Sequence, residues 1–510
     1  MRGILPVLHS DTEVLAALES DSAKIIAAPP SYPFLIALKA QQHPVLVVTS
    51  SSRSAEDLAE SLRDLHSRVY EFPAWETLPH ERLSPRSDTV AQRIATLYSL
   101  QLSEATHPVV VAPVRAVIHR FIATLATQPL WTLEIGQEIG LTELITHLTE
   151  LAFTRTDLVE KRGEFAVRGG IVDVFLPLAM HPVRIDFFGD EIEELRYFEV
   201  ADQRTSEAVI GKLSILPCRE FLLNDEICAR AEKLKSQYLG ALEIIGKIAD
   251  GITVDGMESL IPLLTDDFNT IAQRMPAQTE ILFIDGERIR SRTADLIETN
   301  EEFLEASWSN AAIGASAPLP VEKVTYLSWE ALHEELTTLG LRIGALNPFG
   351  SDLDTDAHFL DIAAIDPMRG NVEALCELLR TGLEAHESVI FSTVGHGMAE
   401  RYSGIFRDAD LPVQMVQSLK ATPTKGSIHI TQSTLGFGFH SDRAGILVVT
   451  ERDLSGSKTT TKDARMPSKR KQAIDPLELR SGDFVVHEQH GIGRYVELIQ
   501  RTVGGVTREY

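Results

Sequence analysis

The stretch AKIIAAPPSYPFLIALKAQQHPVLVV, residues 23–48, decides the fold that we expect for the beginning of the chain. A short apolar run at Ile25 and Ile26 leads into a proline-rich loop, a helix-like segment and a second apolar run at 45–48. This strand, loop, helix, strand order is typical of a phosphate-binding α/β unit. Apolar runs and amphipathic helical patterns alternate onward to about residue 128, which predicts parallel strands covered by helices.

The loop after the first strand, AAPPSYPF, lacks the residues with which such a unit holds a nucleotide. A phosphate loop wraps the phosphates with backbone N–H groups, while its lysine and its hydroxyl bind the phosphates and Mg²⁺. Pro29, Pro30 and Pro33 have no N–H to donate. Tyr32, Pro33 and Phe34 stand where the glycine, the lysine and the hydroxyl are expected. The loop is therefore either a degenerate nucleotide site or an ordinary turn that never bound a nucleotide.

The composition is that of a protein with several ordinary cores, because 510 residues with 44% hydrophobic and 24% charged content exceed one domain. A formal net charge of −25 argues against non-specific coating of nucleic acid, which needs dense Lys and Arg. No apolar stretch reaches the roughly 18 to 20 residues that span a bilayer, and the N-terminus turns polar too early for a secretory signal. We therefore expect a cytoplasmic protein without a membrane partner. The three cysteines form no C-x-x-C pair, so neither disulfides nor zinc are predicted from Cys218, Cys228 and Cys376.

The residue pattern divides the chain into α/β and β-rich parts. After residue 130, the runs EFAVRGGIVDVFLP and VRIDFFGDEIEELRYFEV alternate polar and apolar residues around Gly-Gly and Gly-Asp, which predicts β-hairpins in a small α+β insert. The predicted parts are an α/β domain (1–128), the insert (129–217), a continuation of the α/β module (218–346), a second α/β domain (350–452), a flexible basic linker (453–476) and the truncated start of a small β-barrel (477–510).

The linker and the last run leave alternatives open. The basic residues of the linker form either a solvated tether or a contact with DNA or an acidic surface: Lys458, Lys462, Arg465, Lys469, Arg470 and Lys471. Fewer residues follow the linker than the roughly 40 that a domain needs to fold unaided, so the chain is either a truncated piece or ends in an unfolded module. His487 and His490 lack a third ligand, so we predict no metal site. No set of residues predicts catalysis.

The insert carries a candidate docking surface. In VRIDFF, residues 183–188, alternate side chains lie on opposite faces of a strand, which puts Arg184 and Phe188 on the polar face. Arg168 belongs to the neighbouring strand. Arginine beside a large aromatic residue is common in the hot spots of protein interfaces.

The same residues also allow a purely structural interpretation. Phe188 then packs beneath the turn at Gly189, and the arginines pair with Glu164 or Asp186. The residues alone leave both interpretations open.

Five further segments follow one another along most of the chain. They are FPAWETLPHERLSPRSDTVAQRIATLY (72–98), VVVAPVRAVIHR (109–120), RGEFAVRGGIVDVFLP (162–177), RIDFFGDEIEELRYFEVADQRT (184–205) and GDFVVHEQHGIGRY (482–495). Together they resemble the bacterial transcription-repair coupling factors, the Mfd family. The combination and its order are specific, although no single segment is.

The resemblance implies a multidomain α/β fold. Residues 1–346 would form a module similar to the repair protein UvrB, with two ATPase-like (RecA or helicase-like) halves, a degenerate phosphate loop and the insert. Residues 350–452 would be the family's third domain, and 477 onward would begin its RNA-polymerase-interacting domain. The motor that uses ATP and Mg²⁺ to translocate on double-stranded DNA would follow and is missing here.

The resemblance also implies an adaptor function. Proteins of this family displace RNA polymerase stalled at DNA lesions and recruit the UvrA protein for nucleotide excision repair. Arg168, Arg184 and Phe188 match the positions with which the family contacts UvrA. We therefore expect this chain to bind UvrA and, once completed, RNA polymerase, without a cofactor or catalysis of its own. The alternative is a nucleotide-dependent enzyme with a non-standard ATP site.

Overall fold

The computed structural model describes residues 1–20, 24–78, 83–102, 104–127, 129–238, 241–311, 326–350 and 356–455, together with four short strands between 484 and 509. The chain forms two compact units, 1–461 and 462–510. Residues 453–455 of the predicted linker end the helix α16 (Glu451–Ser455), in which Asp453 is buried. The rest of that linker, with its basic residues, lies outside the described residues, as does His490. None of the described helices has the length and apolar character that crossing a membrane requires.

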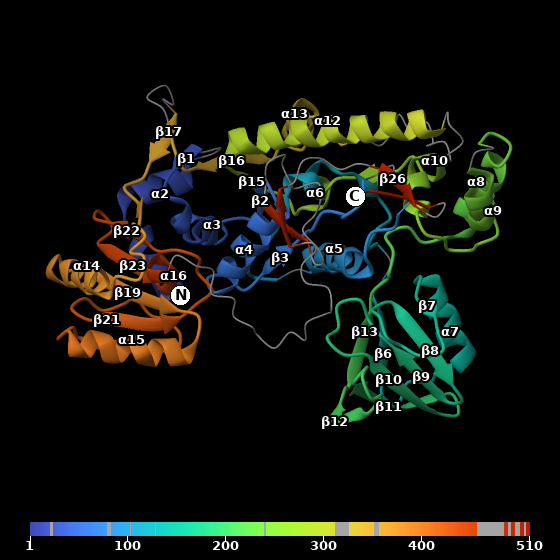
Figure 1. Cartoon of the computed structure of the whole chain (residues 1–510), viewed down its shortest axis with the longest axis horizontal. Coiled ribbons are helices and arrows are strands. Elements are labelled where there is room, and N and C mark those ends of the chain that lie inside the picture. Colours follow the sequence, from blue (N-terminus) through green and yellow to red (C-terminus); the bar gives the residue numbers. More distant parts are fainter. Residues whose placement is uncertain are drawn as a thin grey trace. The chain divides into compact units, whose positions relative to one another are not determined.

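A parallel sheet of seven strands organises the first unit. Its order is β17-β1-β16-β15-β2-β4-β3, and every neighbouring pair is parallel. The strands are β1 (Lys24–Ile26), β2 (Val45–Thr49), β3 (Val69–Glu71), β4 (Val109–Pro113), β15 (Glu280–Ile284), β16 (Arg342–Asn347) and β17 (Ala357–Phe359). β2 and β4 are buried at every position, as central strands of a parallel sheet covered by helices should be. Since β15 and β16 lie between β1 and β2, chain segments from before and after the insert build one sheet (Figure 1).

Further helices and short strands belong to the parts of the chain before and after the insert. Before the insert they are η1 (Arg2–Ile4), α1 (Leu5–His9), α2 (Thr12–Glu19), η2 (Pro29–Ser31), α3 (Tyr32–Lys39), α4 (Ser52–Arg63), α5 (Ser87–Leu100), α6 (Val114–Ile118) and β5 (Phe121–Ile122). After it they are α8 (Asp225–Leu234), α9 (Leu242–Ala249), η4 (Met257–Leu260), α10 (Ile261–Leu264), β14 (Phe268–Asn269), α11 (Ile271–Arg274), α12 (Gly286–Ala311) and α13 (Trp329–Thr338).

The insert is a β-rich domain with one helix. Its six-stranded sheet has the order β12-β11-β10-β9-β8-β7 and is antiparallel except between β7 and β8. Its elements are β6 (Trp131–Glu134), α7 (Leu141–Glu150), β7 (Thr154–Arg155), β8 (Glu164–Arg168), β9 (Ile171–Val174), β10 (Val183–Phe188), β11 (Glu191–Phe198), β12 (Thr205–Val209) and β13 (Lys212–Ile215), with β6 pairing β13. The predicted hairpins are confirmed at Gly169 and Gly189, whose positive φ angles of 62° and 65° suit glycine in tight turns.

A second α/β sheet follows, with the order β18-β22-β23-β19-β21-β20. Its elements are β18 (Ala363–Ala364), α14 (Val372–Glu384), β19 (Ser388–Thr393), α15 (His396–Asp408), β20 (Val413–Met415), β21 (Ile428–Gln432), β22 (Phe439–Ser441) and β23 (Ile446–Thr450). The segment predicted as the second α/β domain, 350–452, also contains β17, which pairs with β1 of the first sheet. The prediction of a chain with several α/β sheets is confirmed.

The second unit contains two antiparallel hairpins. β24 (Phe484–His487) pairs with β25 (Gly491–Arg494), and β26 (Gln500–Val503) pairs with β27 (Val506–Glu509). His487 is thus the last residue of a strand.

Candidate functional site

The backbone N–H groups of the proline-rich loop donate their hydrogen bonds to acceptors within the protein. The four N–H groups between residues 27 and 32 all donate to backbone carbonyl oxygens: Ala27 to Asn347 (3.1 Å), Ala28 to Ile362 (3.3 Å), Ser31 to Ala28 (3.0 Å) and Tyr32 to Pro29. The other three residues up to position 33 are prolines. A phosphate held at a loop of this kind needs N–H groups that point outward. In residues 27–33 none is left for it.

The side chains of the loop belong to the core. Tyr32, Pro33 and Phe34 are buried, and the ring of Phe34 meets Phe439 edge-on at a centroid distance of 5.1 Å. The hydroxyl of Tyr32 is buried without a hydrogen-bond partner among the described residues, and burial together with the charge of Asp285 raises the pKa of Tyr32. Positions that would hold a lysine and a hydroxyl in a nucleotide site are therefore filled by apolar packing.

A buried ion cluster lies at the other end of the helix that begins in this loop. Lys39, the last residue of α3, contacts Glu280 Oε1 through its Nζ at 2.7 Å, and His43 Nε2 lies 2.6 Å from Oε2 of the same carboxylate. Burial alone would raise the pKa of Glu280, but the hydrogen bond with His43 and the charge of Lys39 outweigh it, and the pKa is lowered. Sequence reasoning missed this cluster, because 241 residues separate Lys39 from Glu280.

On the insert, the strand register places Arg168, Arg184 and Phe188 on one face of the sheet. Arg168 on β8 lies opposite Ile171 on β9, and Ile171 lies opposite Asp186 on β10. Asp186 follows Arg184 by two residues, so Arg168 and Arg184 lie on the same face. The register shifts after Asp186, where β11 carries one extra residue, and this bulge preserves the alternation to Phe188. We call Arg168, Arg184 and Phe188 the docking face.

The three residues of the docking face differ in how firmly the protein holds them. Phe188 is 77% exposed. Arg184 is held by Asp173 through two hydrogen bonds of 2.7 and 2.9 Å, and its guanidinium lies 4.9 Å from the centre of the Phe198 ring. Arg168 is exposed and donates from Nη2 to the carbonyl oxygen of Asp157 at 2.8 Å. The face thus offers an exposed aromatic ring at Phe188 and, four residues earlier on the same strand, an arginine that is already oriented.

Two details of the purely structural interpretation of Phe188 and Arg184 are wrong. Phe188 does not pack beneath the turn at Gly189, since most of its surface is in water. The ion-pair partner of Arg184 is Asp173 rather than Glu164 or Asp186. Asp173 could have been found from the sequence, because it alternates with buried Val172 and Val174 on the strand next to Arg184.

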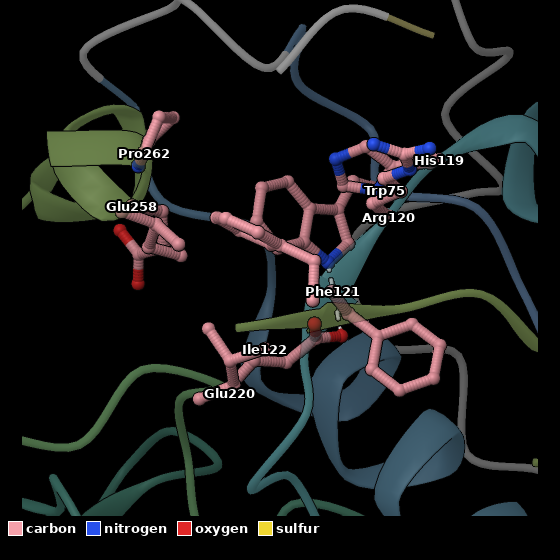
Figure 2. Close-up of a pocket in the computed structure, with 10 residues that line it drawn as sticks. Trp75, His119, Arg120, Phe121, Ile122, Glu220, Glu258 and Pro262 are labelled. Atoms are coloured by element: carbon pink, nitrogen blue, oxygen red, sulfur yellow. Dashed lines mark hydrogen bonds between the residues drawn. The ribbon is translucent and has the colours of Figure 1, made fainter. Parts of the chain in front are cut away.

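A third cluster surrounds a small buried cavity (Figure 2). Trp75 donates from Nε1 to Glu220 Oε1 at 3.0 Å, the contact dashed in Figure 2, and fully buried Arg93 donates to the same oxygen. Burial, assisted by the charges of two neighbouring arginines, holds the pKa of His119 well below its usual value, so its imidazole is neutral. Because Trp75 and Arg93 precede the insert and Glu220 follows the predicted end of the insert, the cluster joins the two sides of the insertion point. Sequence reasoning did not single it out.

Two parts of the chain match known protein families, and longer relatives match most of the chain. Residues 131–221 match the family model described as the UvrB interaction domain, and residues 479–510 match the CarD-like/TRCF RID domain. The transcription-repair-coupling factor of Mycobacterium tuberculosis (strain CDC 1551 / Oshkosh) is 40% identical over 517 residues, which cover 95% of this chain and 41% of that protein. The protein of the same name from Escherichia coli (strain K12) is 27% identical over 504 residues, covering 93% of this chain and 42% of that protein.

The chain spans about two fifths of the length of these curated relatives. The transcription-repair-coupling factor of Bacillus subtilis (strain 168) is 24% identical over 505 residues and shows the same coverage pattern, with 92% of this chain and 41% of that protein. The chain is therefore a relative of the transcription-repair-coupling factors, similar to the N-terminal part of these longer proteins along most of its own length.

Proposed function

We propose that this chain is the adaptor region of a transcription-repair coupling factor and that its insert binds UvrA. The observation that carries the proposal is the docking face, an exposed Phe188 on the same face of β10 as a pre-oriented Arg184, inside the segment that matches the UvrB interaction domain. In the intact protein, this region would recruit UvrA for nucleotide excision repair after the motor has displaced RNA polymerase stalled at a DNA lesion.

The chemistry of the docking face suits a protein partner. An exposed aromatic ring gains free energy when a partner removes it from water. The guanidinium of Arg184, which donates to Asp173 and to the carbonyl oxygen of Gln203, adds a positive charge of fixed position. Arg184 loses little side-chain entropy on binding, because Asp173 and Phe198 already hold it. Phe188 supplies the larger apolar gain, and we expect it to dominate the affinity.

We further propose that the large sheet belongs to two ATPase-like halves whose phosphate loop has lost nucleotide binding. The internal hydrogen bonds of residues 27–32 and the burial of Tyr32, Pro33 and Phe34 support this. ATP, Mg²⁺ and double-stranded DNA would then be bound by the motor of the intact protein, outside this chain. The hairpins from Phe484 onward would begin a barrel that binds RNA polymerase, as the match at 479–510 suggests.

The decisive experiment measures the affinity of the full chain for purified UvrA. We expect Phe188→Ala to weaken binding by roughly 30-fold or more, which corresponds to a hot-spot loss of about 2 kcal/mol. Met180→Ala is the matched control, since Met180 is 54% exposed and precedes β10 at the end opposite to Phe188. Equal affinities of the Phe188→Ala variant and the unchanged chain would overturn the assignment of the docking face.

The alternative of a nucleotide-dependent enzyme is tested separately. Calorimetric titration of the full chain with millimolar ATP and Mg²⁺ should give no saturable heat, because the loop has no free donors between residues 27 and 33. Saturable binding would overturn the adaptor assignment in favour of a non-standard ATP site.

A further inference from the structure

Three metal-ligating side chains meet at one edge of the second α/β sheet. Glu387 precedes β19, His440 is the middle residue of β22, and Asp442 follows β22 in the turn to β23. One ligand atom from each lies within 4.8 Å of the others. His440 Nε2 lies 2.7 Å from Oε1 of Glu387 and 3.4 Å from Oδ1 of Asp442.

The carboxylate of Glu387 is buried and needs a counter-charge. Glu387 is 4% exposed, and among the described residues its carboxylate has no hydrogen-bond or ion-pair partner other than His440. Buried carboxylates in proteins are paired with a cation or bound to a metal ion. Whatever neutralises Glu387 must therefore sit at or beside His440 Nε2.

A glycine in the neighbouring helix makes room for this carboxylate. A Cβ atom on Gly382 of α14 would lie 3.1 Å from Oε2 of Glu387 and 2.8 Å from Cδ2 of Leu447. Glycine inside a helix is unfavourable, so its presence at this position needs a packing reason. The space beside Glu387 supplies that reason, independently of the ligand distances.

We propose that Glu387, His440 and Asp442 bind a divalent transition-metal ion of the zinc type. One imidazole nitrogen and two carboxylate oxygens form a three-ligand set that suits zinc, with a fourth position left for water. Tetrahedral ligands at metal distances of about 2.0–2.2 Å lie about 3.3–3.6 Å apart. The separation of 3.4 Å between His440 and Asp442 fits this spacing, whereas the 2.7 Å hydrogen bond between His440 and Glu387 would have to widen to admit the ion. Water reaches the site from the side of Asp442, whose side chain is 81% exposed.

Such an ion would link Glu387, which precedes β19, to His440 and Asp442 in and after β22. A divalent ion would neutralise the carboxylates of Glu387 and Asp442 at once. The proposal does not depend on the proposed function of the insert.

Zn²⁺ alone, titrated into the full chain in a calorimeter, tests the proposal, and Co²⁺ gives a second readout through its visible absorption. We expect Asp442→Asn and His440→Ala each to weaken binding by about tenfold or more. His396→Ala is the matched control, because His396 and Glu400 form an exposed pair at 3.3 Å that no third ligand joins within the described residues. Asp442→Asn keeps the test valid if His440→Ala fails to fold, since Asp442 is exposed.

Two results would overturn the site. One is a failure of the original chain to bind Zn²⁺, or an affinity for Zn²⁺ that is the same in the original chain, in Asp442→Asn and in His440→Ala. The other is an equal loss in His396→Ala, which would mean that exposed histidines bind the ion without a built site.

Discussion

The proline-rich loop and the docking face differ in whether their polar and apolar groups are buried or exposed. In the loop, the N–H groups of residues 27–32 are used within the protein and the rings of Tyr32 and Phe34 are buried. On the docking face, Phe188 is left in water and Arg184 is held with its guanidinium near the surface. A loop whose donors are used within the protein has none to offer a ligand, whereas apolar area left uncovered on a surface is available to a partner. We therefore expect substitutions in buried contacts to affect stability and substitution of the exposed Phe188 to affect partner binding.

The largest expected effect is on the buried ion cluster of Lys39, His43 and Glu280 at the C-terminal end of α3. Glu280→Gln removes the charge that neutralises Lys39, which is 1% exposed. Loss of one partner from a buried ion pair costs about 3–5 kcal/mol, because the other charge stays buried. Urea unfolding should show this loss, while Glu243→Gln, in an exposed pair with Lys247, should leave the unfolding curve unchanged. Similar curves for the two variants would contradict the prediction.

A smaller loss of stability is expected from Arg184→Ala on the docking face. Asp173 is 2% exposed and would lose both hydrogen bonds from the guanidinium. A buried acceptor left without its donor costs about 1–3 kcal/mol. Unfolding measured by urea should reveal this, so reduced UvrA binding by this variant alone would not distinguish a lost contact from a loosened sheet. A variant as stable as the unchanged chain would show that Arg184 does not support the fold.

Acid should remove part of the stability that Glu280 supplies. Its pKa is lower in the folded protein than the ordinary value of 4.5, so its contribution is fully present above that value and is lost as the pH falls through the lowered pKa. The difference in unfolding free energy between the unchanged chain and Glu280→Gln should therefore narrow on going from pH 7 to about pH 3. A difference that stays constant over this range would argue against a charged Glu280 in the fold.

The smallest expected effect on stability is that of Phe188→Ala. Because its side chain is largely in water, the free energy of unfolding should change by no more than about 0.5 kcal/mol. The same variant should lose most of its UvrA affinity, which makes it a sharper probe of the docking face than Arg184→Ala. A destabilisation comparable to that of Arg184→Ala would mean that Phe188 packs against the protein after all.

Sequence patterns predicted the elements that depend on neighbours along the chain. The hairpins at Gly169 and Gly189 follow from glycine turns between alternating strands, and the buried strands β2 and β4 follow from apolar runs. The patterns did not predict that Arg184 pairs with Asp173, that Glu220 holds Arg93, or that Glu280 joins Lys39 to His43. The contacts of Glu220 and Glu280 depend on which distant segments the fold brings together, whereas Asp173 lies only 11 residues before Arg184, opposite it on the neighbouring strand.

The sequence by itself determined that the proline-rich loop has too few amide donors, because proline lacks an N–H in any fold, and that Pro33 and Phe34 stand where a phosphate loop has its lysine and its hydroxyl. It also determined the alternation that places Arg184 and Phe188 on one face of a strand. Only the tertiary structure decided that the remaining amides are used internally and that Phe188 lies in water. Ala27 and Ala28 donate to Asn347 and Ile362, which follow the insert, and local pattern carries no information about such distant partners.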